Sequence, residues 1–265
     1  MIGPYQKNSI VVGDCLEVMK KLPSNSVNLV VTSPPYNIGK DYGKGTDKDV
    51  MTWPDYYEWL GNVLRMLYRI VVTGGIVALN IPQTVRTKSR QLDGGLRHEW
   101  VFANIVPIMV DIGWLLREPL VWVKGSPGNA MASNTAMGSD SNPYLRACHE
   151  MIILASKERY YFSGRTGKRW QLPIDLCKDV WHIMGKSHKN HPAIFPEQLP
   201  ESLIVLFCPD GGLVFDPFMG SGTTAVTADR LGRCYFGCDT SEEYVKIANV
   251  RIFKDRIKRS QLEMF

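Results

Sequence analysis

The chain has 265 residues, a formal net charge of +5 and a hydrophobic content of 45%. This length suits one large domain, or one domain with a sizeable insertion. The small net charge excludes a uniformly polycationic nucleic-acid binder, so any nucleic-acid surface has to be local. The six cysteines lack the spacing of zinc ligands, and no apolar run approaches membrane-spanning length. With no signal pattern at the start, we expect a cytoplasmic protein with reduced thiols, no bound metal and no membrane partner.

The first part of the chain alternates short apolar runs with amphipathic segments. We expect strands at 9–12, 27–31 and 76–81 and helices at 15–22 and 53–72, the second helix ending at Gly74-Gly75. A polar loop is expected over 84–96, then a helix over 99–112 that breaks near Pro107, and then strands at 120–124 and 151–156.

The last part of the chain continues the same alternation. We expect helices at 196–207, 223–231 and 241–258 and strands at 213–216 and 234–238. Gly232 is a plausible residue to end the helix at 223–231, and Thr240 with Glu243 forms a capping box for the last helix. The repeated strand–helix order predicts an α/β fold with a doubly wound, mostly parallel sheet.

Thr32-Ser33-Pro34-Pro35-Tyr36 directly follows one of the expected strands. The two prolines end the strand because they lack N–H donors and fix φ, which leaves a stiff segment where open α/β sheets place their ligands. The Ser33 hydroxyl and the free carbonyls can accept hydrogen bonds, and the Tyr36 ring offers a flat stacking face. This combination suits an exocyclic amino group on an aromatic base. The alternative is a simple Pro-Pro turn with Tyr36 in the core.

A second motif is the glycine turn Gly220-Ser221-Gly222, which lies between the strand that ends at Asp216 and a helix. Asp239, at the end of the next strand, is suitably placed to bind ribose hydroxyls. The spacing is neither that of a dinucleotide site nor that of a Walker motif. A nucleoside cofactor without pyrophosphate fits better, and S-adenosylmethionine is one, with Asp216 facing its positive end. The alternative is a tight turn that binds no ligand.

Two segments are rich in residues that suit contacts with nucleic acid. The glycine-rich stretch 37–45 is expected to form a loop beside the site. Segment 157–191 has eight basic and three acidic residues with interleaved aromatic residues, so its charge excess equals that of the whole chain. We interpret it as a surface that contacts phosphates and reads sequence. The alternative is a solvated surface region with a small aromatic core.

Together, Ser33-Pro34-Pro35-Tyr36 and the stretch 216–224 resemble the amino-group DNA methyltransferases of prokaryotic modification systems, and the order of the motifs resembles their β group. The resemblance implies transfer of a methyl group from S-adenosyl-L-methionine to the exocyclic amine of a flipped base in double-stranded DNA. The implied catalytic residues are Ser33, Pro34, Pro35 and Tyr36. The implied cofactor-binding residues are Asp14, Cys15, His191, Pro192, Asp216, Pro217, Phe218, Gly220, Ser221, Gly222, Thr223 and Asp239. The expected DNA-binding residues are Lys40, Arg165, Lys168, Arg169 and Lys186.

The resemblance also divides the chain and suggests the base. We expect a catalytic half at 1–156, a target-recognition insert at 157–190 and a cofactor-binding half at 191–265. A serine at the first motif position is mostly found in cytosine-N4 enzymes and an aspartate in adenine-N6 enzymes, so Ser33 predicts cytosine N4, with adenine N6 as the alternative. Two further hypotheses are an enzyme that methylates RNA or a protein amide, and a non-catalytic DNA-binding module. A cognate restriction endonuclease and a second copy of the chain are possible partners.

Overall fold

The computed structural model describes residues 1–39, 51–88, 96–124, 148–160, 174–184 and 196–262. The strands are β1 (Ser9–Val12), β2 (Val27–Thr32), β3 (Val71–Ile81), β4 (Val85–Lys88), β5 (Leu96–Glu99), β6 (Trp114–Leu116), β7 (Leu120–Val123), β8 (His149–Lys157), β9 (Val180–His182), β10 (Leu213–Asp216) and β11 (Cys234–Asp239). The helices are α1 (Cys15–Lys20), α2 (Trp53–Ile70), α3 (Val101–Ile112), α4 (Gln198–Phe207), α5 (Thr223–Arg230) and α6 (Glu242–Leu262), with a short 3-10 helix, η1, at Ile174–Cys177.

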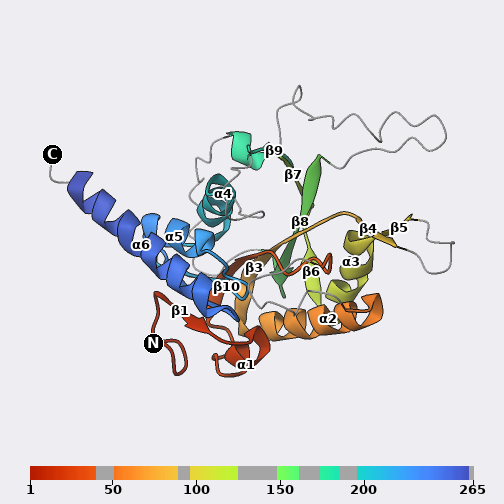
Figure 1. Cartoon of the computed structure of the whole chain (residues 1–265), viewed down its shortest axis with the longest axis horizontal. Coiled ribbons are helices and arrows are strands. Elements are labelled where there is room, and N and C mark those ends of the chain that lie inside the picture. The colour runs from red at the N-terminus through yellow and green to blue at the C-terminus, as the bar shows by residue number, and fades with distance from the viewer. Residues whose placement is uncertain (40–50, 89–95, 125–147, 161–173, 185–195, 263–265) are drawn as a thin grey trace.

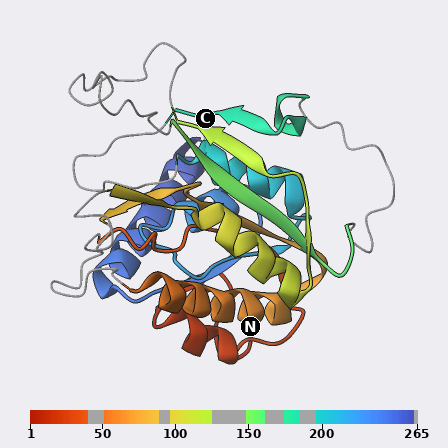
Figure 2. The same ribbon diagram turned by 90° about the vertical axis from the view of Figure 1, so that its right-hand side faces the viewer.

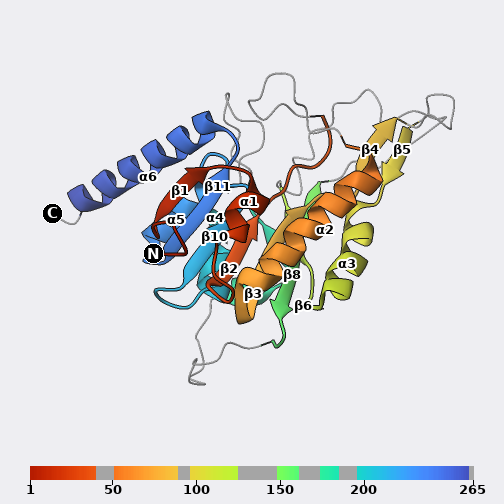
Figure 3. The ribbon, with the colours of Figure 1, turned by 90° about the horizontal axis from the view of Figure 1, so that it is seen from below.

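Within these ranges one large sheet runs in the order β1-β11-β10-β2-β3-β8-β7-β9, with β6 beside β8 (Figure 1). The strands from β1 to β3 in this order are parallel, β8 is antiparallel to β3, and β7 is antiparallel to β8. Helices α1, α2 and α3 cover one face of the sheet and α4, α5 and α6 cover the other (Figures 2 and 3). The expected doubly wound, mostly parallel α/β fold is confirmed.

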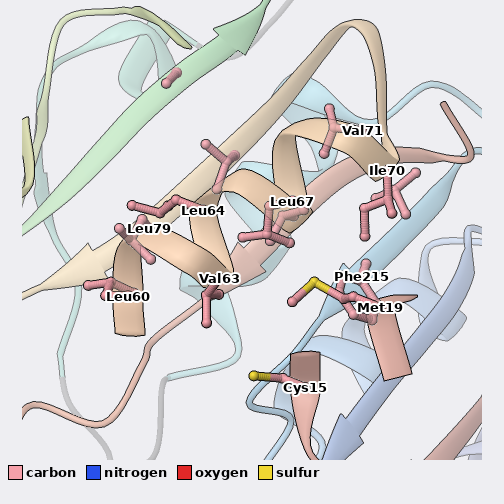
Figure 4. Close-up of a cluster of buried hydrophobic side chains, with 14 of the residues drawn as sticks. Cys15, Met19, Leu60, Val63, Leu64, Leu67, Ile70, Val71, Leu79 and Phe215 are labelled. Atoms are coloured by element: carbon pink, nitrogen blue, oxygen red, sulfur yellow. The ribbon is translucent and has the colours of Figure 1, made fainter. Parts of the chain in front are cut away.

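Burial on both faces explains why the central strands are apolar at nearly every position. Along β10, Phe215 packs towards α1 and α2, whereas its neighbour Val214 packs towards the opposite helices. Figure 4 shows the first of these two layers, in which Met19 of α1 and Leu67 of α2 lie near Phe215. Side chains alternate along a strand, so one uninterrupted apolar run fills both layers.

Three expected element boundaries are wrong. Helix α2 ends at Ile70, and Gly74-Gly75 lies inside β3, where a Cβ on Gly75 would come within 2.9 Å of the Val72 carbonyl oxygen. The region expected to be a polar loop contributes β4 and the first residue of β5, which pair antiparallel, and Glu99, the expected start of the next helix, is the last residue of β5. Helix α3 continues through Pro107, because it buries Val101 and other residues against the sheet. This packing outweighs a proline penalty of about 3 kcal/mol.

The cap of the last helix is also different from the expectation. α6 begins at Glu242, and the Ser241 hydroxyl accepts from the Tyr244 amide at 3.3 Å, so the capping residue is Ser241 rather than Thr240. The Ser241 amide in turn donates to Asp239 Oδ1 at 2.8 Å, which ties the start of the helix to the end of β11.

The segment expected to contact DNA partly belongs to the sheet. Trp181 of β9 is buried, and β9 pairs parallel with β7. Lys157, the last residue of β8, is also buried, and its ammonium group donates to Asn25 Oδ1 at 2.7 Å and to the Val71 carbonyl at 3.1 Å. A phosphate-contacting role for Lys157 is therefore wrong. Across the ranges given above, no helix has both the length and the apolar character that crossing a membrane requires.

Candidate active site

The carboxyl ends of four parallel strands bring both sequence motifs to one edge of the sheet. β2 and β10 are direct neighbours, with Phe215 opposite Val30, so Thr32 and Asp216 end side by side. The Thr32 hydroxyl donates to Asp216 Oδ1 at 2.6 Å. β1 and β11 are parallel neighbours as well, with Val12 opposite Asp239. The edge that open α/β sheets use for ligands therefore carries Ser33, Asp216, Asp239 and the start of α1 together.

Asp216 joins the two motifs through hydrogen bonds inside the protein. Its Oδ1 accepts from the Thr32 hydroxyl and from the Phe218 amide at 3.0 Å, and its Oδ2 accepts from the Thr224 hydroxyl at 2.8 Å. Burial raises the pKa of Asp216 to about 6, against the effect of these hydrogen bonds. We expected this carboxylate to face the ligand, and the structure corrects this: the side chain is 3% exposed and both oxygens are turned inwards.

The two glycines of the turn differ in the space around them. Gly220 and Gly222 have φ values of 51° and 83°, a region that favours glycine. A Cβ on Gly222 would lie 2.6 Å from the Ala248 Cβ of α6, whereas one on Gly220 would meet no heavy atom closer than 3.9 Å. The outer side of the turn at Gly220 is therefore open, and its inner side packs tightly on α6.

Arg251 of α6 donates hydrogen bonds to the glycine turn and to the first residue of α5. One guanidinium nitrogen, Nη1, donates to the Ser221 carbonyl at 2.7 Å, to the Ser221 hydroxyl at 2.9 Å and to the Thr223 hydroxyl at 3.1 Å. The other, Nη2, donates to Glu197 at the start of α4 at 3.3 Å. Sequence reasoning missed Arg251, which gives no motif signal because it lies among other charged residues of a long helix.

Asp239 links the glycine turn to β11. Its Oδ2 accepts from the Gly220 amide at 2.8 Å. A carboxylate has about four acceptor positions. Asp239 Oδ1 accepts from the Ser241 amide at 2.8 Å, and the Asp239 residue is half-buried. Contact between Asp239 and ribose hydroxyls stays a prediction.

The other expected cofactor residues divide by exposure. Phe218 and Ser221 are half-buried, whereas Pro217 and Thr223 are buried. Asp14 is exposed and caps α1 by accepting from the Leu16 amide at 2.9 Å. The Cys15 thiol is buried and its pKa is raised to about 12, mainly by burial, so it is a neutral group inside the core.

The Ser33–Tyr36 segment is fixed at both ends. The Ser33 hydroxyl donates to the Tyr36 hydroxyl at 3.0 Å, and Pro34 is buried. The Tyr56 hydroxyl of α2 donates to the Pro35 carbonyl at 2.9 Å. The double proline is therefore clamped between the end of β2 and α2, with Ser33 half-buried at the edge.

Sequence reasoning missed two residues that contact Tyr36. The side-chain nitrogen of Asn80, on β3, donates to the Tyr36 hydroxyl and to Glu150 Oε2, both at 2.7 Å. The Tyr36 hydroxyl in turn donates to the same Glu150 oxygen at 3.1 Å. Lys124, just after β7, forms an ion pair with the other oxygen of Glu150. Asn80 could have been found as a polar residue inside an apolar strand, whereas Glu150 lies one residue before the strand we expected.

Several expected site residues lie outside the described parts of the chain. They are Lys40, Arg165, Lys168, Arg169, Lys186, His191 and Pro192. Their roles stay predictions, as do the three domain boundaries.

Comparison with known proteins decides the family. The model of the N6/N4 "DNA methylase" family matches residues 27–250, which include both motifs. The chain belongs to this family of amino-group DNA methyltransferases. Among curated relatives, the Type II methyltransferase M.SmaI of Serratia marcescens is 30% identical over 277 residues, covering 93% of this chain and 91% of the relative. M.BglII of Bacillus subtilis is 28% identical over 255 residues, covering 91% and 68%.

Solved structures show the same architecture. The putative DNA modification methylase TTHA0409 of Thermus thermophilus, in complex with S-adenosyl-L-methionine, superposes with a TM-score of 0.73 at 28% identity, covering 93% of each chain. The cytosine-N4-specific PvuII DNA methyltransferase superposes with a TM-score of 0.71, covering 93% of this chain and 86% of that one. At 21% identity, the PvuII likeness supports the fold alone.

Proposed function

We propose that this DNA methyltransferase transfers the methyl group of S-adenosyl-L-methionine to the N4 amino group of cytosine in double-stranded DNA. The observation that carries the proposal is the hydrogen bond between Thr32 and Asp216, which places the Ser33–Tyr36 segment beside the glycine turn. A base and a nucleoside cofactor bound at these two segments would be neighbours. Catalysis by such a site depends mainly on positioning and electrostatics.

The residues of the glycine turn fit S-adenosyl-L-methionine, the cofactor of this family. When bound, this cofactor supplies a methyl group on a positively charged sulfur. The open side of Gly220 leaves room for a ligand, and the carboxylate of Asp239 would hold the ribose hydroxyls. The half-buried ring of Phe218 and the backbone at Asp14 and Cys15 would line the nucleoside part.

Ser33 supports cytosine as the target. Because its hydroxyl proton points to Tyr36, the lone pairs of Ser33 Oγ remain as acceptors for an amino group. A neutral acceptor of this kind, in place of an aspartate, is the feature that the family associates mostly with cytosine N4.

Adenine N6 is the second candidate, and a relative favours it. "DNA adenine methyltransferase YhdJ" of Escherichia coli is 25% identical over 279 residues, covering 93% of this chain and 83% of YhdJ. Under this alternative the same segment would bind the N6 amino group of adenine. A cognate restriction endonuclease and dimerisation stay predictions.

The test is methyl transfer with isotopically labelled cofactor to duplex DNA, RNA and protein, followed by digestion of the nucleic acids and mass analysis of the nucleosides. We expect labelled N4-methylcytosine from duplex DNA and none from the Ser33→Ala variant. Labelled N6-methyladenine would replace the cytosine proposal by the adenine one. The absence of methylated bases from every duplex, with cofactor binding intact, would refute the proposed function.

A further inference from the structure

The Tyr36 hydroxyl connects Ser33 to a carboxylate that has no part in the motifs of this family quoted above. Resting on the proposed function, we propose that Glu150 is a positioning residue that orients the Ser33 and Tyr36 hydroxyls and receives through them the proton lost by the target amine. The chain of contacts is Ser33 Oγ to Tyr36 Oη at 3.0 Å and Tyr36 Oη to Glu150 Oε2 at 3.1 Å.

The hydrogen-bonding chemistry of the three groups sets the direction of this chain. An Asn amide nitrogen can only donate and an ionised carboxylate can only accept. Asn80 donates to the Tyr36 hydroxyl at 2.7 Å, so the single proton of Tyr36 goes to Glu150 and its remaining acceptor capacity takes the Ser33 proton. The Ser33 oxygen is thereby left with its lone pairs directed away from Tyr36, towards a bound amino group.

The reaction requires such a route because methylation leaves a surplus proton. The amino nitrogen forms its bond to the methyl carbon, the electron pair of the broken carbon–sulfur bond stays on sulfur, and the positive charge moves to nitrogen. The nitrogen then releases a proton to Ser33 Oγ as Ser33 passes its own proton to Tyr36 and Tyr36 passes its proton to Glu150. The products are a neutral thioether, a neutral methylated amine and a protonated Glu150, and both hydroxyls are restored.

Glu150 is placed to pass the proton on to solvent. Its side chain is 13% exposed, and Lys124, its ion-pair partner, is 44% exposed. In the described parts of the chain, the groups that contact Glu150 are the Lys124 ammonium from the end of β7, the Asn80 side-chain amide from β3 and the Tyr36 hydroxyl. The adjacent His149 contacts Gln83 at 3.1 Å through its Nε2.

A second carboxylate of the chain provides a matched control. Glu99 is 5% exposed, and its Oε1 accepts from the Tyr57 hydroxyl and from the Asn104 amide, both at 2.8 Å. The Asn104 amide also donates to the Tyr57 hydroxyl at 2.9 Å. The pattern is that of Glu150 with a tyrosine and an asparagine, but this tyrosine does not belong to the Ser33–Tyr36 segment.

The experiment compares Glu150→Gln, Glu150→Asp, Tyr36→Phe, the Glu150→Gln/Tyr36→Phe double variant and Glu99→Gln with the wild type. Single-turnover rates on duplex DNA are measured from pH 7 to 9, and cofactor dissociation constants are measured by calorimetry. Glutamine keeps the shape and can still accept from Tyr36, but it cannot take up a proton. We expect Glu150→Gln to slow transfer by about 10²-fold, with a cofactor dissociation constant within about twofold of the wild-type value.

Four further results are expected if the proton follows this route. The Glu150→Gln rate should rise with pH, because the proton then leaves to solvent base, and Glu150→Asp should recover part of the rate. The double variant should be about as slow as the slower single variant, because both changes interrupt one chain. In NMR spectra of protein with ¹³C-labelled tyrosine rings, the resonance of Tyr36 is identified as the one missing from Tyr36→Phe. This resonance should shift in Glu150→Gln and keep its position in Glu99→Gln.

The outcomes separate this inference from the proposed function. If the wild type methylates duplex DNA and a folded Glu150→Gln variant does so at the same rate, the role of Glu150 is overturned and the proposed function stands. If Glu150→Gln does not fold, a Tyr36→Phe rate equal to that of the wild type overturns the inference instead. A wild type that methylates no duplex overturns the proposed function, and the inference with it.

Discussion

Replacing Asp216 by asparagine should make the protein relatively more stable as the pH rises. The pKa of this buried carboxyl is raised from its ordinary 3.8 to about 6, so the folded protein keeps a proton that the unfolded chain releases. The stability from Asp216 is therefore fully present below pH 3.8 and is lost as the pH rises through about 6. The difference between the pKa of 3.8 in the unfolded chain and about 6 in the folded protein corresponds to about 3 kcal/mol of unfolding free energy.

Asparagine is a close match for the hydrogen bonds at this site. Its oxygen can accept from Thr32 and the Phe218 amide as Asp216 Oδ1 does, and its amide can donate to Thr224 if that hydroxyl rotates. The assay is urea unfolding of both proteins between pH 4 and 7.5, followed by tryptophan fluorescence. From pH 4 to 7.5 the unfolding free energy of Asp216→Asn should rise relative to that of the wild type, by the larger part of about 3 kcal/mol.

Asp229→Asn is the control for the pH effect. Burial raises the pKa of Asp229, but its bonds to Arg256 and Arg259 outweigh burial and leave the pKa below its ordinary value. The difference between this variant and the wild type should therefore stay constant from pH 5 to 7.5. If the Asp216→Asn difference changes by less than about 1 kcal/mol over the full range, the reasoning about desolvation at Asp216 is wrong.

Gly222→Ala should destabilise the protein by about 1–3 kcal/mol more than Gly232→Ala. Both glycines have positive φ, but only a Cβ at position 222 would collide with Ala248. Equal unfolding free energies of the two variants would contradict this. Arg251→Lys should weaken S-adenosyl-L-methionine binding about tenfold, which is about 1.4 kcal/mol by calorimetry, since lysine cannot reproduce the guanidinium contacts with Ser221. Lys157→Met should lower the melting temperature, because it removes the buried hydrogen bond to Asn25, and it should leave the salt dependence of DNA binding unchanged. A weaker salt dependence in the variant would show that Lys157 contacts DNA phosphates after all.

The sequence predicted the strand–helix alternation and the fold because two-sided burial produces uninterrupted apolar strands, which are easy to recognise. It also predicted that the two motifs belong at strand ends, because the double proline and the glycine turn are local signals. It did not predict that Gly75 lies inside β3, since that requires the position of Asn28 on the neighbouring strand, whose carbonyl oxygen would lie 3.0 Å from a Cβ.

Contacts across the sheet were beyond prediction for the same reason. The inward orientation of Asp216 depends on Thr32, which is 184 residues away in the chain. The link between Tyr36 and Glu150 spans 114 residues. Neither pair has a spacing that repeats or a motif that joins its members, so only the order of strands in the sheet reveals them.

The position of β10 between β11 and β2 has a consequence for biosynthesis. A ribosome releases β2 long before residues 213–216 exist, so an emerging chain holds one side of β2 without its partner strand. Pairing across such a separation is intrinsically slow. The catalytic edge can be completed only after β10 has been translated, and a nascent polypeptide stalled before β10 should be able neither to retain cofactor nor to modify DNA.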